Sequence, residues 1–166
     1  MTDKLRYINA GGKLIDLSVP KIMGIINVTP DSFFSGSRYK TQEEIINAAA
    51  GMIRDGADII DVGGYSTRPG AEDISADIEK KRLLEAVKLI KKEFSEAVIS
   101  VDTFRADVAQ EAVLDCGASI INDVAGGEAD PAMFGIIEKL NVPYVLTHMQ
   151  GTPRTMQVKP EYGNVV

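Results

Sequence analysis

One loop of the sequence carries several groups that could bind an anion or a carboxylate. Residues 61–70 read DVGGYSTRPG and follow a short, mainly apolar segment at 57–60. That segment suits a buried parallel strand and is too short for a helix. The two glycines let a ligand approach the backbone, and the Ser-Thr-Arg run adds two hydroxyls and a guanidinium. Polar loops just past buried strands are where α/β proteins bind ligands.

A carboxylate and a carboxamide stand at comparable places further along the chain. Asp102 ends one apolar segment and Asn122 ends the next. A carboxylate accepts two parallel N–H groups, whereas a carboxamide offers one donor and one acceptor. On neighbouring strands, the pair would suit the edge of a flat amino-pyrimidinone ring. Each residue could instead simply cap the loop after its strand, which Asp and Asn do readily.

Strands and helices alternate along the chain, and this alternation would position the polar groups. Strands are predicted at 22–26, 59–62, 98–101, 119–121 and 143–146, and helices at 41–55, 75–94, 105–116 and from Pro131 onward. A hairpin of 5–9 and 14–17, turning at Gly11 and Gly12, precedes them. Strict alternation of strand and helix predicts a parallel sheet with right-handed crossovers.

Two architectures fit this alternation, an open doubly wound sheet and a closed β/α barrel. Every predicted strand ends in a polar group, namely Asn27, Asp61, Asp102, Asn122, and Thr147 or His148. A barrel places its site at the carboxyl ends of all strands, whereas an open sheet concentrates such residues at one switch point. The sequence therefore favours a TIM-type β/α barrel.

The chain is shorter than a full barrel, which takes eight strands and typically ~250 residues. Its 166 residues predict an incomplete barrel of about five parallel strands and four helices at 21–166, with the N-terminal hairpin at 1–20 capping it. Unpaired strands at the ends of such a sheet expose backbone. We therefore expect these residues alone to be inactive and poorly stable.

Composition excludes several partners. The net charge of −6 and pI near 4.8 argue against a nucleic-acid groove or an anionic membrane surface as partner. The only cysteine, Cys116, allows no intrachain disulfide, which fits a reducing compartment. The sequence contains no recognisable secretory signal or membrane-spanning run. These features predict a cytoplasmic protein.

Several segments closely resemble the motifs of the dihydropteroate synthase family. NVTPDSF at 27–33 and DVGGYSTRPG at 61–70 are similar to its first two loop motifs. SVDT at 100–103, INDV at 121–124 and HMQGTP at 148–153 match later segments in the right order. The resemblance runs from residue 22 to residue 157, and its first two motifs are long and specific.

The resemblance implies a barrel enzyme of folate biosynthesis. Such an enzyme joins dihydropterin-methyl diphosphate to para-aminobenzoate, releases diphosphate, acts with magnesium as a homodimer and is inhibited by sulfonamides. By matching position, Asn27 would be the magnesium and diphosphate ligand. Asp102 and Asn122, with Thr67, would bind the pterin.

The same resemblance assigns the aminobenzoate side to the loops. Phe33, Arg68 and Pro69 would form it, and Asn27, Thr67 and Arg68 would be the catalytic group. Leaving diphosphate gathers negative charge, which magnesium and fixed donors would neutralise. No general base is needed, because an arylamine is barely basic before it attacks.

Three positions depart from the family pattern, and a second reading stays open. Tyr65 stands where the family often has an acidic residue, Ser35 where it often has a second aspartate, and Thr147 where it often has methionine. The alternative is the pterin-binding barrel domain of a cobalamin-dependent methyltransferase. The two loop motifs favour the synthase, because a methyltransferase has no diphosphate to neutralise.

Overall fold

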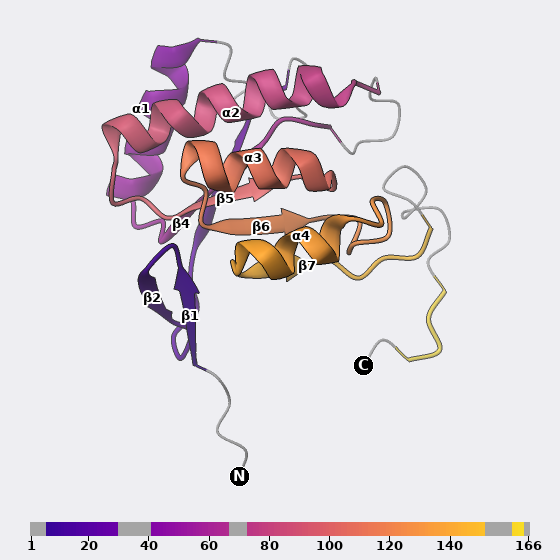
Figure 1. Ribbon diagram of the computed structural model, residues 1–166. Coiled ribbons are helices and arrows are strands. Elements are labelled where there is room, and N and C mark those ends of the chain that lie inside the picture. Colours follow the sequence, from indigo (N-terminus) through magenta and orange to yellow (C-terminus); the bar gives the residue numbers. More distant parts are fainter. Residues whose placement is uncertain (1–5, 30–40, 67–72, 152–160, 165–166) are drawn as a thin grey trace.

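The computed structural model describes residues 6–29, 41–66, 73–151 and 161–164. Its elements, in chain order, are β1 (Tyr7–Ala10), β2 (Lys13–Asp16), β3 (Met23–Asn27), α1 (Gln42–Arg54), β4 (Ile59–Gly63), α2 (Ala76–Glu93), β5 (Ile99–Asp102), α3 (Ala106–Cys116), β6 (Ile120–Asp123), α4 (Met133–Leu140) and β7 (Tyr144–Leu146) (Figure 1). The predicted alternation of strand and helix is confirmed.

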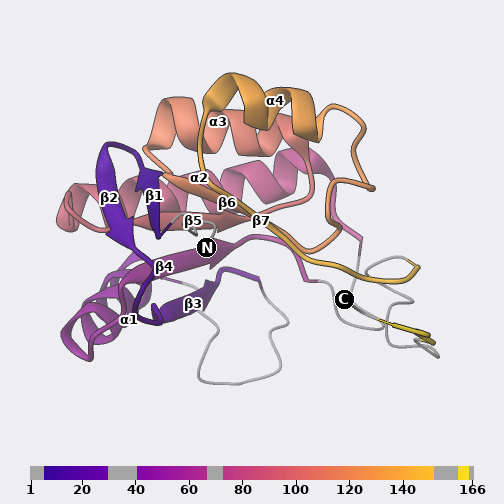
Figure 2. The same cartoon turned by 90° about the horizontal axis from the view of Figure 1, so that it is seen from below.

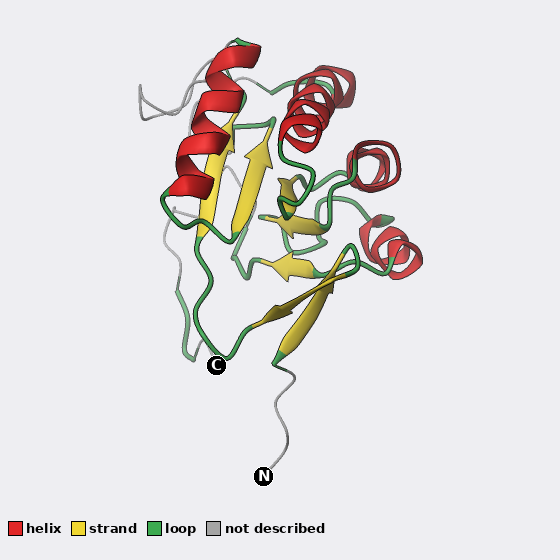
Figure 3. Ribbon diagram, turned by 90° about the vertical axis from the view of Figure 1, so that its left-hand side faces the viewer, coloured by secondary structure: helices red, strands yellow, loops and turns green. Residues whose placement is uncertain are grey.

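The main sheet has five parallel strands in the order β3-β4-β5-β6-β7, so each strand pairs with its neighbour in the chain. Helices α1, α2, α3 and α4 lie in an arc along one side of this sheet (Figure 3). Sequential parallel strands with all crossover helices on one side are typical of a β/α barrel. The fold is the predicted incomplete TIM-type barrel, with five parallel strands and four helices among the described residues.

The main hydrophobic core lies between the helices and the outer face of the sheet. Successive side chains of a strand point to opposite faces. Alternate residues such as Ile26, Val62 and Val101 therefore meet the apolar stripes of the helices, including Leu83 and Val108, and all five are fully buried. Burying each such side chain stabilises the fold by about 1.5–3 kcal/mol.

Local sequence signals set the helix ends. Thr41 and Glu44 form the predicted capping box at the start of α1, with each side chain hydrogen-bonded to the other residue's backbone N–H. Ser75 caps α2 through Ile78 N–H. Gly117 ends α3 in a left-handed conformation (φ 81°), which glycine adopts without strain. No described helix is long and apolar enough to span a bilayer.

The hairpin β1-β2 packs at the amino end of the barrel strands (Figure 2). Its predicted turn is confirmed, with Gly11 and Gly12 at φ 61° and 89°. Ala10 and Ile15 form a second core with Ile59, Val98 and Ile120, which belong to or directly precede the inner strands. The hairpin therefore lies at the opposite end of the sheet from the carboxyl ends of the strands.

Two sequence predictions need correction. Strand β4 runs on to Gly63, so Asp61 lies inside the strand and not at its tip, because pairing with β3 and β5 continues to the glycine. Helix α4 begins at Met133 and not at Pro131. Its first turn is replaced by an Asp130 turn, in which the Asp130 carboxylate accepts from Ala132 N–H at 2.9 Å.

Candidate active site

The strand register brings three of the predicted site residues into one row. Asn27, Gly63, Asp102 and Asn122 are successive partners across β3, β4, β5 and β6. Side chains in one row of a parallel sheet point to the same face. Asn27, Asp102 and Asn122 therefore point to the inner face, away from the helices, at the carboxyl end of the sheet. We call Asn27, Gly63, Asp102 and Asn122 the inner row.

Gly63 leaves an open place in the inner row. A Cβ at Gly63 would lie 3.2 Å from Asn27 Oδ1 and 3.6 Å from Asp102 Oδ2. The amide and the carboxylate thus flank the same space from either side. A side chain at residue 63 would fill that space, whereas glycine lets a ligand lie against the backbone between the two oxygens.

A buried polar pair lies directly beneath the inner row. Asp61 and Ser100 are register partners on β4 and β5, and both face inward. Asp61 is 3% exposed, and its Oδ2 accepts a hydrogen bond of 3.1 Å from Asn122 Nδ2. Its Oδ1 and the Ser100 hydroxyl have no hydrogen-bond partner among the described residues. Burial raises the pKa of Asp61, and polar contacts with Ser100 and Asn122 oppose that shift.

Asp102 lies in a strongly acidic environment. Loss of solvation, followed by the charges of Asp61, Glu79 and Asp123, raises the pKa of Asp102 to about 8. The carboxyl group is therefore largely protonated at neutral pH without a ligand. N–H donors from a ligand would favour the ionised form and lower this pKa again. The site is suited to a ligand edge rich in N–H groups.

Asp123 organises the loop that follows β6. Its Oδ1 accepts from Ala125 N–H at 2.7 Å, and its Oδ2 accepts from Gly127 N–H at 2.9 Å and from the Tyr144 hydroxyl at 2.6 Å. Its backbone carbonyl accepts from Thr147 N–H at 3.1 Å. One buried carboxylate thus fixes the loop after β6 and the end of β7.

A second network supports the ends of the loop at 67–72. The fully buried Glu79 accepts a 2.6 Å hydrogen bond from the Thr103 hydroxyl and pairs with Arg105. Arg105 also donates to the Ile74 carbonyl at 2.7 Å and lies 5.2 Å from the Tyr65 ring. Tyr65, one of the three departures from the family pattern, thus contacts the same arginine. The network links the residues that flank the loop on both sides.

Four of the predicted site residues, Phe33, Thr67, Arg68 and Pro69, lie outside the described residues, as does Ser35. The sequence reading missed Asp61 as a partner of Asn122, and it missed Glu79 and Arg105 altogether. An acidic residue in a helix's first turn is ordinarily a surface feature. Only its burial distinguishes Glu79, so no sequence signal separates it from Asp77 nearby.

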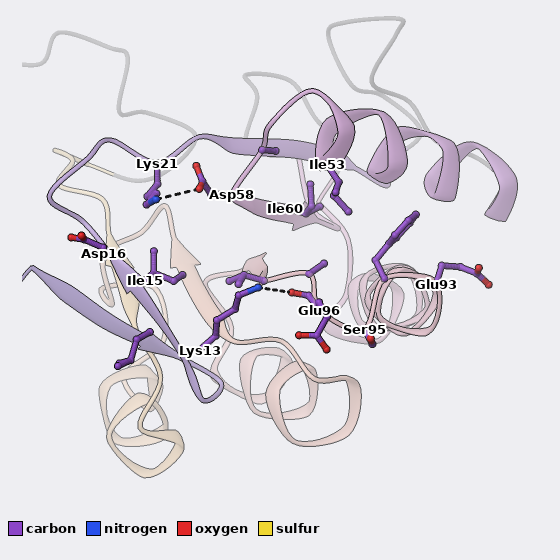
Figure 4. A pocket seen from close by; sticks show the side chains of 15 residues that line it. Lys13, Ile15, Asp16, Lys21, Ile53, Asp58, Ile60, Glu93, Ser95 and Glu96 are labelled. Atoms are coloured by element: carbon purple, nitrogen blue, oxygen red, sulfur yellow. Dashed lines mark hydrogen bonds and ion pairs between the residues drawn. The ribbon is translucent and has the colours of Figure 1, made fainter.

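A cavity of about 780 Å³ lies at the opposite end of the barrel from the inner row (Figure 4). It is bounded by the hairpin strand β2 and by the ends of α1 and α2, and no predicted site residue lines it. Lys13 Nζ donates to the Glu96 carbonyl at 3.1 Å, and Lys21 pairs with Asp58 at 3.3 Å. The cavity lies between the hairpin and the barrel, and none of the inner-row residues lines it.

The described residues could hold a magnesium ion through one protein oxygen, but not within a cluster of acidic side chains. The described residues contain no group of three or more His, Cys, Asp or Glu side chains that could hold a metal. Magnesium, however, keeps several waters and often takes one or two protein oxygens together with substrate phosphates. Asn27 Oδ1, beside the open space at Gly63, is a hard oxygen donor of that kind.

Fold, inner row and sequence together define a pterin-binding β/α barrel. The sequence profile described as "Pterin binding enzyme" matches residues 23–166, and the chain belongs to that family.

Its relatives include dihydropteroate synthases. The enzyme of Bacillus subtilis (strain 168) is 51% identical over 127 residues, which cover 76% of this chain and 44% of the relative. That of Escherichia coli (strain K12) is 44% identical over 156 residues, 94% of this chain and 54% of the relative. The chain thus spans about half the length of these relatives.

A solved structure gives the same result. Yersinia pestis dihydropteroate synthase, in a complex with a sulfonamide drug, superposes with a TM-score of 0.87 at 39% identity. The match covers 95% of this chain and 56% of that one.

Proposed function

We propose that the complete protein containing this chain is a dihydropteroate synthase of folate biosynthesis. It joins dihydropterin-methyl diphosphate to para-aminobenzoate and releases diphosphate. The observation that carries the proposal is the inner row, in which Asn27, Asp102 and Asn122 share one face at the carboxyl ends of adjacent strands. The similarity to synthases over most of the chain supports it.

Asp102 and Asn122 hold the pterin in this proposal. The Asp102 carboxylate accepts N–H groups of the ring, and binding favours its ionised form. Asn122 presents its remaining amide atom to the neighbouring edge of the ring. Adjacent strands keep the two groups in fixed register, so the ring is oriented before reaction.

Asn27 borders the open space at Gly63, and in this proposal the diphosphate leaves on that side. It would hold magnesium, which when bound supplies positive charge against the diphosphate. During the reaction the amine nitrogen forms a bond to the pterin methylene carbon while the carbon–oxygen bond to diphosphate breaks. The electron pair leaves with the diphosphate, and the amine proton passes to solvent. Positioning and charge stabilisation supply the acceleration.

The loops complete the proposed site. Thr67 contributes to the pterin side, and Phe33, Arg68 and Pro69 form the aminobenzoate side, with Asn27, Thr67 and Arg68 as the catalytic group. Arg105 contacts Tyr65 before residues 67–72 and Ile74 after them. These contacts support a fixed position for the residues that flank that segment. Sulfonamides would compete with para-aminobenzoate there.

The test is diphosphate release by the complete protein with both substrates and magnesium. We expect release that requires para-aminobenzoate, falls when magnesium is chelated and drops at least about a hundredfold in Asn27→Ala, which removes a charge-stabilising ligand. A Lys21→Ala protein, altered at the far end of the barrel, is the matched control. Methyl transfer to cobalamin without diphosphate release would instead support the methyltransferase reading and overturn this one.

Three further assignments belong to the proposal. Residues 1–20 close the amino end of a barrel whose body begins at residue 21, which the contacts of Ala10 and Ile15 support. The complete protein is a homodimer, which light scattering of the purified protein tests. It acts in the cytoplasm, and the free, buried thiol of Cys116 is consistent with a reducing compartment.

A further inference from the structure

A hydrogen bond beneath the inner row joins residues on two strands that are not neighbours. Asn122 on β6 donates through Nδ2 to Asp61 Oδ2 on β4, and β5 lies between these strands. The bond therefore crosses the inner face of β5 close to Ser100, the register partner of Asp61. It is the only hydrogen bond recorded for the Asn122 side chain among the described residues.

The chemistry of this bond fixes which way the Asn122 amide faces. The amide nitrogen of Asn122 faces Asp61 Oδ2, and a carboxylate oxygen that carries no proton can only accept a hydrogen bond from it. The amide oxygen then faces away from Asp61 and is left to accept from a ligand. Rotating the amide by half a turn would set its oxygen against the carboxylate oxygen, which is repulsive. Without Asp61, either orientation would be available.

Asp61 is too deeply placed to touch a ligand. It is 3% exposed, and its Oδ1 is fully buried. Gly63 lies above it on the same strand, and Asp102 and Asn122 lie above Ser100 and Ile120 on the neighbouring strands. We therefore expect Asp61 to affect binding through the residues of the inner row.

We propose that Asp61 is a positioning residue, which holds the Asn122 amide with its oxygen toward the ligand and so makes the site select a ring edge that donates an N–H group there. The inference rests on the proposed function, since it concerns how that site reads its pterin. The place of Asp61 inside β4, and not at the tip of that strand, sets it beneath the inner row.

The neighbouring hydroxyl makes a conservative test available. In Asp61→Asn, the new amide oxygen can still accept from Asn122, while the new nitrogen faces Ser100, whose hydroxyl can accept from it. The orientation of Asn122 is then preserved. In Asp61→Ala the acceptor is lost, and Asn122 is no longer held. The two variants therefore separate loss of the acceptor from loss of the charge.

The experiment measures the affinity of the complete protein for pterin, without the second substrate, by calorimetry. Asp61→Ala should weaken binding about tenfold, the size of one well-placed hydrogen bond to the ligand. Asp61→Asn should stay within about threefold of the unmodified protein. Ser100→Ala, a matched change in the same buried layer, should also stay within about threefold.

A double-mutant cycle separates positioning from a general structural role. In an Asn122→Ala background, Asp61→Ala should change the affinity no more than about threefold, the effect expected of the lost charge alone, because the residue that Asp61 positions is gone. If Asp61→Ala does not fold, Asp61→Leu, which keeps the branched outline of the side chain and lacks an acceptor, takes its place in the cycle.

Two results would overturn the inference. One is an unchanged affinity in the Ala variant, and the other is an equal loss with and without Asn122. The absence of pterin binding by the unmodified protein would instead overturn the proposed function, and the inference with it.

Discussion

Replacing Asp102 with asparagine should weaken pterin binding and at the same time stabilise the ligand-free protein. The pKa of Asp102 rises from its ordinary value of 3.8 to about 8 in the folded chain, because of burial and the surrounding carboxylates. Between these two values the folded state binds more protons than the unfolded state, so stability falls as pH rises. Asparagine has no ionisable group at this position, so the variant escapes that loss.

The linkage relation gives the size of the difference. The relevant quantity is the free energy of unfolding, compared with its value at low pH, where Asp102 is protonated in both states. With the two pKa values of 3.8 and about 8, this free energy falls by less than about 1 kcal/mol at pH 4 and by about 4 kcal/mol at pH 7. Local relaxation and entry of water lower such figures. We therefore expect Asp102→Asn to be more stable by about 2–4 kcal/mol at pH 7, with the two proteins converging toward pH 4.

The assay is urea unfolding of the complete protein and of Asp102→Asn, without ligand or added metal, at intervals from pH 4 to pH 8. If the new amide changed stability by other means, the plot of unfolding free energy against pH would shift for the variant without changing its slope. The difference in slope between the two proteins is therefore the test of the raised pKa. Parallel curves across this range would refute the raised pKa. Calorimetry on the same samples should show pterin affinity lowered at least about tenfold in the variant.

The remaining predictions concern the open space at Gly63, the proton on Asp102 and the ion pair between Glu79 and Arg105. Gly63→Ala should lower kcat/KM at least about tenfold with little change in Tm, because its methyl group would lie 3.2 Å from Asn27 Oδ1; full activity would show that the space is not used. Pterin binding at pH 7 should release close to one proton from Asp102, measured by calorimetry in buffers of different ionisation enthalpy, and zero release would contradict it. Arg105→Ala should destabilise the protein by about 3 kcal/mol, because the buried Glu79 carboxylate loses its cation, and adding Glu79→Gln should recover part of this loss in urea unfolding.

Much of the fold follows from local sequence signals. The capping pair Thr41 and Glu44, the left-handed Gly117 and the apolar strand segments act over a few residues, so each can be read without the rest of the chain. The order of elements then gives the topology, because parallel strands joined by helices connect with one handedness. The two errors, the end of β4 and the start of α4, lie where pairing or a turn extends past the local signal.

The candidate site was predictable only in part. The types and strand positions of Asn27, Asp102 and Asn122 indicated polar groups at the carboxyl end of a sheet. Their presence in one row depends on the register of four strands, which is set by packing along the whole sheet.

The sequence by itself determined the kind of fold and the residues that could meet at its open end. Only the tertiary structure decided that Asp61 holds Asn122 from 61 positions away, and that Glu79 pairs with Arg105 from the next βα unit. The physical reason is range. Propensity and periodicity act between near neighbours, whereas the partner of a buried charge is chosen by the space and the solvent exclusion that the whole fold creates.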